Sequence, residues 1–249
     1  MTTHEYLCRH FARMGARVLV RGPRRLQRTK IAIDVGRDRS GELFVIGCQD
    51  DVAVEILDVQ PRSHHLVLMT REGSDKHKFL LGRDERHWFA AAVPGDGVRD
   101  VRTAIASLRP PEIEGREALR QGEWFFVPEP GVSDKDAVIL HDEPLSRGGR
   151  SKPHICAQMM RKGGQAMMVS RQYPTGISLK EYDELISTNE RARRFGWQPM
   201  VRDAEVYARG EVRHRDHKTV TLWCWHRVFM NQERFAKHAP QIAFLDYNP

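Results

Sequence analysis

Short apolar runs follow one another closely through the first hundred positions of the chain. They are four to eight residues long and rich in β-branched and aromatic residues, which is typical of strands. Turn-forming stretches such as RGPRR, GRDRSG and EGSD separate them. Because no helical crossover lies between consecutive runs, they predict an antiparallel meander or a small barrel. The runs are ARVLV, KIAIDV, ELFVIG, VAVEILDV, HLVLMT, KFLL and HWFAAAV.

Two helices are predicted beside these strands, because apolar residues recur there with a period close to that of an α-helix. The first begins at Thr2, which has capping-box spacing with Glu5, and ends near Gly15. The second covers positions 98–108 and stops before Pro110. The apolar faces of the two helices consist of Leu7, Phe11 and Met14, and of Val98, Val101, Ile105 and Leu108.

Helix and strand signals alternate beyond residue 150. Ser151 and Pro153 are typical of a helix start, and that helix is expected to end at Gly163. The segment SLKEYDELI predicts a second helix with its own capping box. The segments QAMMVS, AEVYARG and TVTLWCW predict strands, and a short terminal helix is expected from Asn231 to just before Pro240.

Together these elements predict an α+β protein, with a β-rich N-terminal part and a mixed α/β, basic C-terminal part. Two stretches rich in proline, glycine and charged residues suggest boundaries, one around Pro110 and one from Pro128 to Pro153. We therefore expect a β-rich domain with an N-terminal helix at 1–110, a strand-containing linker or loop region at 111–153, and a basic mixed domain at 154–249.

Composition narrows the class of protein. Of the 249 residues, 40% are hydrophobic and 29% are charged, which is typical of a folded chain rather than a disordered one. No apolar run approaches the roughly 20 residues that span a bilayer, and the first residues lack the apolar core of a signal peptide. The four cysteines lie far apart and form no CxxC pair, so we expect small buried thiols. These features predict a cytoplasmic protein with no membrane partner.

Positive charge is concentrated in the C-terminal part. The net charge is +7, and residues 141–249 hold 18 Lys and Arg against 12 Asp and Glu, whereas residues 1–140 hold 22 against 21. Positive charge concentrated in one part of a protein favours the binding of polyanions, chiefly nucleic acid. Basic residues gather at three points: a glycine pair, an aromatic segment, and the stretch GEVRHRDHKTVTLWCWHRV. They are Arg147, Arg150 and Lys152; Arg193 and Arg194; and Arg213, Arg215 and Lys218.

The last of these stretches also holds candidate metal ligands. Strand-like runs flank RHRDHK, which predicts a β-hairpin with His214, Asp216 and His217 near its tip. A strand rises about 3.3 Å per residue, so His226 would lie roughly 30 Å from the tip and cannot share its metal. At least one further ligand must come from elsewhere, and His154, His141 and Asp142 are the candidates.

No familiar catalytic motif is present in the sequence. There is no GxxxxGK[ST], GxGxxG, GxSxG or HExxH, and no zinc-finger spacing. VRHRDH matches part of the HxHxDH motif of metallo-β-lactamase-type hydrolases, but Val212 stands where the first histidine should be. The adjacent carboxylates Asp84 and Glu85 are expected to point in different directions on a strand, which disfavours a catalytic pair.

Three functions remain open from the sequence, and no catalytic residue is assigned. The leading hypothesis is a non-catalytic nucleic-acid-binding or complex-assembly protein, without a cofactor, whose contacts lie after residue 141 and whose partner is nucleic acid or a larger protein or nucleoprotein complex. The first alternative is a divalent-metal-dependent hydrolase or nuclease built on His154, His214, Asp216 and His217. The second alternative is a protein-interaction scaffold whose charge is incidental.

Overall fold

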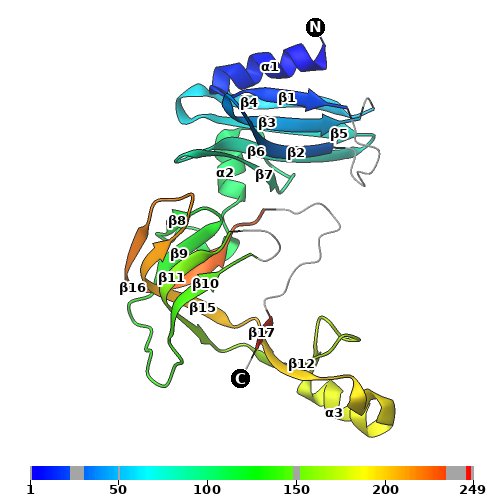
Figure 1. Cartoon of the computed structure of the whole chain (residues 1–249), viewed down its shortest axis with the longest axis vertical. Helices are drawn as coiled ribbons and strands as arrows, with labels where there is room; N and C mark the ends of the chain where they lie inside the picture. The colour runs from blue at the N-terminus through cyan, green and yellow to red at the C-terminus, as the bar shows by residue number, and fades with distance from the viewer. Residues whose placement is uncertain (1, 23–30, 50, 148–151, 234–244, 248–249) are drawn as a thin grey trace.

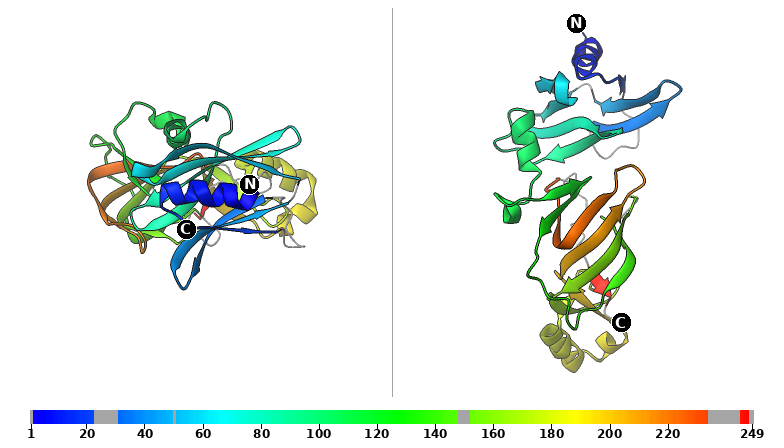
Figure 2. Two further views of the ribbon diagram at one scale, coloured as in Figure 1. Left: turned by 90° about the horizontal axis from the view of Figure 1, so that it is seen from above. Right: turned by 90° about the vertical axis from the view of Figure 1, so that its left-hand side faces the viewer.

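The computed structural model describes residues 2–22, 31–49, 51–147, 152–233 and 245–247. Figure 1 shows an N-terminal part above a second body, with a smaller arm at the far end, and Figure 2 shows the same arrangement from two further directions. Within the described residues, no helix is long and apolar enough to cross a membrane.

The N-terminal part combines one helix with two sheets. Helix α1 (Thr3–Met14) begins at the predicted capping box of Thr2 and Glu5 and ends at Gly15, whose φ of 85° only glycine adopts readily. The first sheet has the order β1-β3-β2, with β1 parallel to β3, and the second has the order β4-β5-β6-β7 and is an antiparallel meander. The strands are β1 (Val18–Arg21), β2 (Ile31–Asp38), β3 (Gly41–Cys48), β4 (Ala53–Gln60), β5 (His65–Glu72), β6 (Asp75–Asp84) and β7 (His87–Val93), with a short 3₁₀ turn, η1 (Pro61–Ser63), between β4 and β5.

Apolar faces of these elements form the core of the N-terminal part. Leu7, Phe11 and Met14 of α1 are fully buried against Phe44 and Leu68 of the two sheets. Each such side chain contributes roughly 1.5–3 kcal/mol on burial. Helix α2 (Val101–Ser107) covers the other side of the meander, and it is shorter than its predicted range. One residue of its expected apolar face, Ile105, remains 39% exposed.

The second body is an antiparallel sheet in the order β10-β11-β15-β16-β9-β8. Its strands come from both the predicted linker region and the predicted C-terminal domain, and that domain division stays a prediction. They are β8 (Leu119–Gln121), β9 (Trp124–Pro128), β10 (Leu140–Leu145), β11 (His154–Lys162), β15 (Glu205–Arg213) and β16 (Val220–Met230), and the 3₁₀ turn η2 (Pro111–Ile113) precedes them.

An arm is inserted between β11 and β15 and projects from the sheet (Figure 1). It contains β12, β13, β14 and the helix α3, which begins at the predicted capping box of Ser178 and Glu181. The later strand β17 pairs with β14, so that the sheet of the arm has the order β13-β12-β14-β17. Trp197 packs on Tyr173 and Tyr182 and is part of this arm's own packing. The elements are β12 (Gln165–Val169), β13 (Ile177–Ser178), α3 (Leu179–Thr188), η3 (Glu190–Arg194), β14 (Gln198–Arg202) and β17 (Leu245–Tyr247).

The predicted α+β fold class is wrong. Strands make up 49% of the structure and helices 18%, and the C-terminal part is mainly strand rather than mixed. The helix expected from Ser151 to Gly163 is replaced by β11, which lies between β10 and β15 and buries Cys156 and Met159. The segment is rich in helix-forming residues, but pairing on both edges and burial outweigh that weak propensity. Residues 231–233 of the expected terminal helix are not helical, and residues 234–244 lie outside the described residues.

Candidate metal centre

Three histidines from distant parts of the sequence meet at one end of the six-strand body. His154 begins β11, while His214 and His217 lie in the loop between β15 and β16. Antiparallel pairing of β11 with β15 sets Ile155 opposite Arg213, and this register brings His154 beside the start of that loop. One ring nitrogen of each histidine can be chosen so that all three lie within 4.8 Å of one another.

The three imidazole rings lie nearly parallel. Ring centroids are 4.2 Å apart for His154 and His214, 4.6 Å for His214 and His217, and 5.7 Å for His154 and His217. A tetrahedral zinc ion with bonds of about 2.0–2.1 Å holds its ligand nitrogens about 3.3 Å apart. Binding of such an ion therefore requires that the nitrogens approach by up to about 1.5 Å and that the rings turn out of their stacked arrangement, because each nitrogen lone pair lies in the plane of its ring.

His154 has an unsatisfied hydrogen-bonding requirement. Its side chain is fully buried, and neither ring nitrogen has a hydrogen-bond partner among the described residues. Leaving a buried polar group unpaired costs about 1–3 kcal/mol, so such groups in folded proteins call for an explanation. A metal ion bound to one of these nitrogens would supply the missing partner.

Gly122 forms the floor beneath two of the rings. It lies in the turn between β8 and β9 and has a φ of +59°. A Cβ placed on Gly122 would lie 3.0 Å from Nε2 of His217 and 3.3 Å from Nε2 of His154. The side-chain amide of buried Gln121 donates to the carbonyl oxygen of Val212 at 3.2 Å, and this bond ties the turn to the end of β15. The Nε2 atoms of His154 and His217 thus converge over a position where a larger residue would crowd them.

Neighbouring groups orient the two loop histidines. Nδ1 of His217 lies 3.8 Å from Oδ2 of Asp84, and a carboxylate behind a ligand histidine is a common arrangement in metal sites. The backbone amide of Asp216 donates to Nδ1 of His214 at 3.1 Å. A metal binds a free nitrogen lone pair, and the lone pair of Nδ1 is occupied by this hydrogen bond. His214 can therefore bind a metal only if the hydrogen bond breaks or if its imidazole ring flips.

The surroundings keep two histidines of the cluster, His154 and His214, neutral at physiological pH. Burial, together with the neighbouring His214 and His217, lowers the pKa of His154 to about 3. Burial and His217 also lower the pKa of His214 below its ordinary value. Neutral imidazole is the form that binds metal, so these side chains are in the ligating state.

The lowered pKa predicts an acid-sensitive fold for the metal-free protein. His154 is neutral in the folded state down to about pH 3, whereas the unfolded chain protonates it below about 6.5. The unfolded state therefore binds more protons in this interval, and folding stability falls as the pH drops through it. Between about pH 7.5 and about pH 5 we expect His154 to account for a loss of about 1–2 kcal/mol. Chemical denaturation at both pH values measures this loss, and His154→Leu should reduce it; an equal loss in that variant would contradict the assignment.

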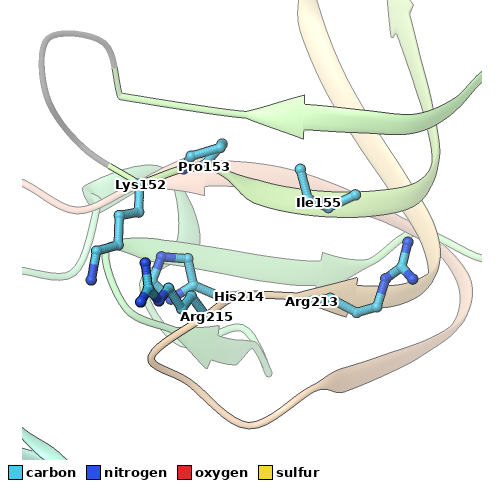
Figure 3. Close-up of a pocket in the computed structure, with 6 residues that line it drawn as sticks. All are labelled: Lys152, Pro153, Ile155, Arg213, His214 and Arg215. Atoms are coloured by element: carbon cyan, nitrogen blue, oxygen red, sulfur yellow. The ribbon is translucent and has the colours of Figure 1, made fainter.

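Two hollows flank the cluster. One is an open groove of about 560 Å³, lined by Lys152, Pro153, Ile155, Arg213, His214 and Arg215. Figure 3 shows Lys152, His214 and Arg215 gathered at one end of this groove and Arg213 at the other. The second hollow, of about 300 Å³, lies between the two bodies of the molecule. Its lining includes His217, Gly122, Glu123, Asp84, Arg120 and Arg147.

The predicted metal set is brought together in part. His154, His214 and His217 form the cluster, whereas the carboxylate of Asp216 pairs with Nζ of Lys152. Asp142, considered as a further ligand, pairs with Arg213 instead. His226 pairs with Ala208 near the end of the β15–β16 ladder that is farthest from the tip, and it is not a member of the cluster.

The predicted nucleic-acid-binding residues are spread over the molecule. Lys152, Arg213 and Arg215 line the groove beside His214, while Arg147 lines the hollow between the bodies and pairs with Glu233. Arg150 lies outside the described residues. Arg193 and Arg194 lie in η3 on the arm, and Lys218 lies in the β15–β16 loop, where its backbone amide donates to Glu85 at 2.6 Å. Their role in nucleic-acid binding stays a prediction.

Several residues of the site were not found from the sequence. Gly122 and Gln121 lie at the turn between β8 and β9. They lie near the histidines because of the strand order of the six-strand sheet, which the local sequence does not show. Asp84 was considered only as half of a catalytic pair, yet it lies behind His217. The sequence predicts only a strand-containing linker or loop region at 111–153, and no local signal places Gly122 against residues 154 and 217.

Comparison of the chain with protein-family models, with curated proteins and with solved structures finds no match. The interpretation of the site accordingly rests on the geometry and chemistry of the chain itself. The features that bear most on it are the three histidines, the glycine floor and the two hollows beside them.

Proposed function

We propose that this protein is a metal-dependent hydrolase whose ion is held by His154, His214 and His217. The observation that carries the proposal is His154, a fully buried imidazole with both ring nitrogens unpartnered among the described residues, facing two further histidines. Three neutral imidazoles are a known ligand set of catalytic zinc sites, which keep a fourth position open. An ion bound there would act as a Lewis acid and lower the pKa of a water molecule.

The charges around the cluster favour an anionic substrate. Arg215 lines the groove beside His214 and Arg120 lines the hollow beside His217, and neither forms an ion pair among the described residues. Guanidinium groups match the geometry of phosphate oxygens and bind them in pairs. Phosphate esters are therefore the substrate class that we propose.

Glu123 is the carboxylate best placed to move a proton at the site. It follows Gly122 directly in the β8–β9 turn and lines the same hollow as His217. Asp84 faces Nδ1 of His217, and Asp216 is paired with Lys152, so both of these carboxylates are already engaged. We assign Glu123 the role of general base toward a water molecule in the hollow.

Glu123→Gln tests this assignment. The variant keeps the size of the side chain and should bind metal like the parent protein, because Glu123 is not a ligand. Its turnover of an activated phosphodiester, bis(p-nitrophenyl) phosphate, should fall by about 10²- to 10⁴-fold, the usual contribution of a general base. Glu112→Gln, an exposed position in η2, serves as the control and should leave turnover unchanged. If the zinc-loaded parent protein shows no turnover of phosphate esters, the hydrolase proposal is wrong.

The sequence-based hypothesis of nucleic-acid binding through the C-terminal part stays a prediction. Several of its basic residues are neutralised within the structure, because Lys152 pairs with Asp216, Arg213 with Asp142, and Arg147 with Glu233. A cation that is already paired with a carboxylate releases fewer counterions from a polyanion than an unpaired cation does. We therefore expect this surface to bind nucleic acid more weakly than its basic residues suggest. The geometry supports the histidine cluster better.

A further inference from the structure

A second basic groove lies in the N-terminal part, where the sequence carries almost no net charge. It has a volume of about 460 Å³ and opens between the end of α1, the β2–β3 hairpin and the β6–β7 hairpin. Four arginines from separate segments line it, although the 140 residues that supply them are nearly neutral overall. The lining residues are Gly15, Arg17, Arg37, Ser40, Glu42, Arg83, Arg86 and Trp88.

Folding leaves part of this positive charge free. Arg17 is held by Asp38 through two hydrogen bonds of 2.8 Å, so its charge is neutralised. Arg37 lies 3.5 Å from Glu42 but is 70% exposed. Arg83 and Arg86 have no carboxylate partner in the part of the chain that the structure describes. Two unpaired guanidinium groups and a third that is largely exposed therefore line one groove.

The carboxylate of the groove is already satisfied. Glu42 accepts hydrogen bonds from Nδ1 of His87 at 2.7 Å and from the backbone amide of Trp88 at 3.1 Å. Its side chain is only 18% exposed. Glu42 thus anchors the β6–β7 hairpin against β3, and its charge offsets that of Arg37, so the excess positive charge of the groove comes from Arg83 and Arg86.

An aromatic ring lies among these cations. Trp88 lines the groove, and the guanidinium of Arg83 lies 5.8 Å from the centre of its ring. Arginines around an aromatic side chain suit single-stranded nucleic acid, whose phosphates pair with the cations while its bases stack. An acidic peptide would supply carboxylates for the cations but no regular series of bases to stack on the aromatic ring.

We propose that this groove binds the backbone of single-stranded nucleic acid, with Arg83 and Arg86 as the main phosphate contacts. Strand alternation turns Arg83 toward the groove, whereas its neighbour Asp84 faces His217. Trp88 lines both this groove and the hollow beside the histidine cluster. A strand seated in the groove therefore passes next to the candidate metal centre, but its binding does not depend on a metal.

The test uses the full chain in the presence of EDTA, so that its result is independent of the metal site. Binding of a fluorescent 20-nucleotide oligothymidylate is followed by anisotropy over a series of salt concentrations. The double variant Arg83→Ala/Arg86→Ala should bind more than about 10-fold more weakly, and its log–log salt slope should fall by about 0.7 for each lost phosphate contact. Neither arginine has a carboxylate partner in the described structure, so the variant should fold normally.

A matched control removes two exposed arginines of the N-terminal part that lie outside the groove, Arg71→Ala/Arg102→Ala. This control should keep both the affinity and the slope of the parent protein. Equal losses in the two double variants would show unspecific attraction and overturn the proposal. Absence of oligonucleotide binding would also overturn it, as would displacement of the oligonucleotide by inorganic phosphate at equal concentration, since the site would then bind free phosphate.

Discussion

Replacing His154 by alanine is expected to abolish zinc binding. The metal-free parent protein should take up one zinc ion in a calorimetric titration, because ring nitrogens of three histidines lie within 4.8 Å of one another. Removing even an outer-shell partner of a metal lowers affinity by 10- to 100-fold, so loss of a ligand should exceed about 100-fold. Zinc should stabilise the parent protein by about 2.7 kcal/mol at one hundred times its dissociation constant, and His154→Ala not at all.

His226→Ala is the matched control for this variant. His226 is also fully buried, and its Nε2 has no partner among the described residues, but it lies outside the cluster. Both substitutions should destabilise the fold through lost packing, whereas only His154→Ala should lose zinc. Unchanged zinc affinity in His154→Ala, with the variant folded, would contradict the proposed centre.

Gly122→Ala is expected to damage the same site without touching a ligand. The new methyl group would lie 3.0 Å from Nε2 of His217 and 3.3 Å from Nε2 of His154, closer than ordinary contacts. The rings must move apart to accommodate it, so zinc affinity should fall by about 10- to 100-fold, as for other displaced ligands. The left-handed backbone at φ +59° should add a stability loss of about 1 kcal/mol. Zinc titration and denaturant unfolding measure the two effects separately.

Gly115→Ala is the control that separates backbone strain at a positive φ from crowding of the histidine rings. Gly115 has a similar positive φ of +73°, but a Cβ there would meet nothing within 4 Å. It should therefore lose a similar amount of stability and keep full zinc affinity. If Gly122→Ala binds zinc as tightly as Gly115→Ala does, the glycine floor has no role in the site.

The strands of the N-terminal part lie where the sequence predicts them. Their period-two runs and the turn residues between them are local signals, and the capping boxes at Thr2 and Ser178 mark the starts of α1 and α3. The hairpin with His214 and His217 near its tip is equally local, and β15 and β16 pair as expected. The parallel pairing of β1 with β3 has no local signal, since it depends on the route of the chain between them.

The segment from His154 to Lys162 shows why the fold class was wrong. Its alanine, glutamine and methionines favour a helix, and a serine and a proline precede it as in many helix starts. Partners 9 to 58 residues away decide otherwise, because β10 and β15 pair with both of its edges. Tertiary pairing of this kind leaves no trace within a window of ten residues.

The candidate site was half predictable for the same reason. The spacing of His214 and His217 beside a turn is visible in the sequence, and His154 was considered as a third ligand. The register of β11 against β15 is what makes them neighbours, and no sequence window shows it. The floor at Gly122 and the carboxylate of Asp84 come from still more distant segments.

Anomalous X-ray scattering would show directly where the protein binds zinc. Crystals of the zinc-loaded protein, measured at the zinc absorption edge, yield an anomalous difference map that locates the ion independently of any assumed site. If the three histidines bind the ion, the map should show one strong peak about 2.0–2.1 Å from a ring nitrogen of each of His154, His214 and His217, above the turn at Gly122. No peak at these histidines, or the strongest peak elsewhere on the chain, would contradict it.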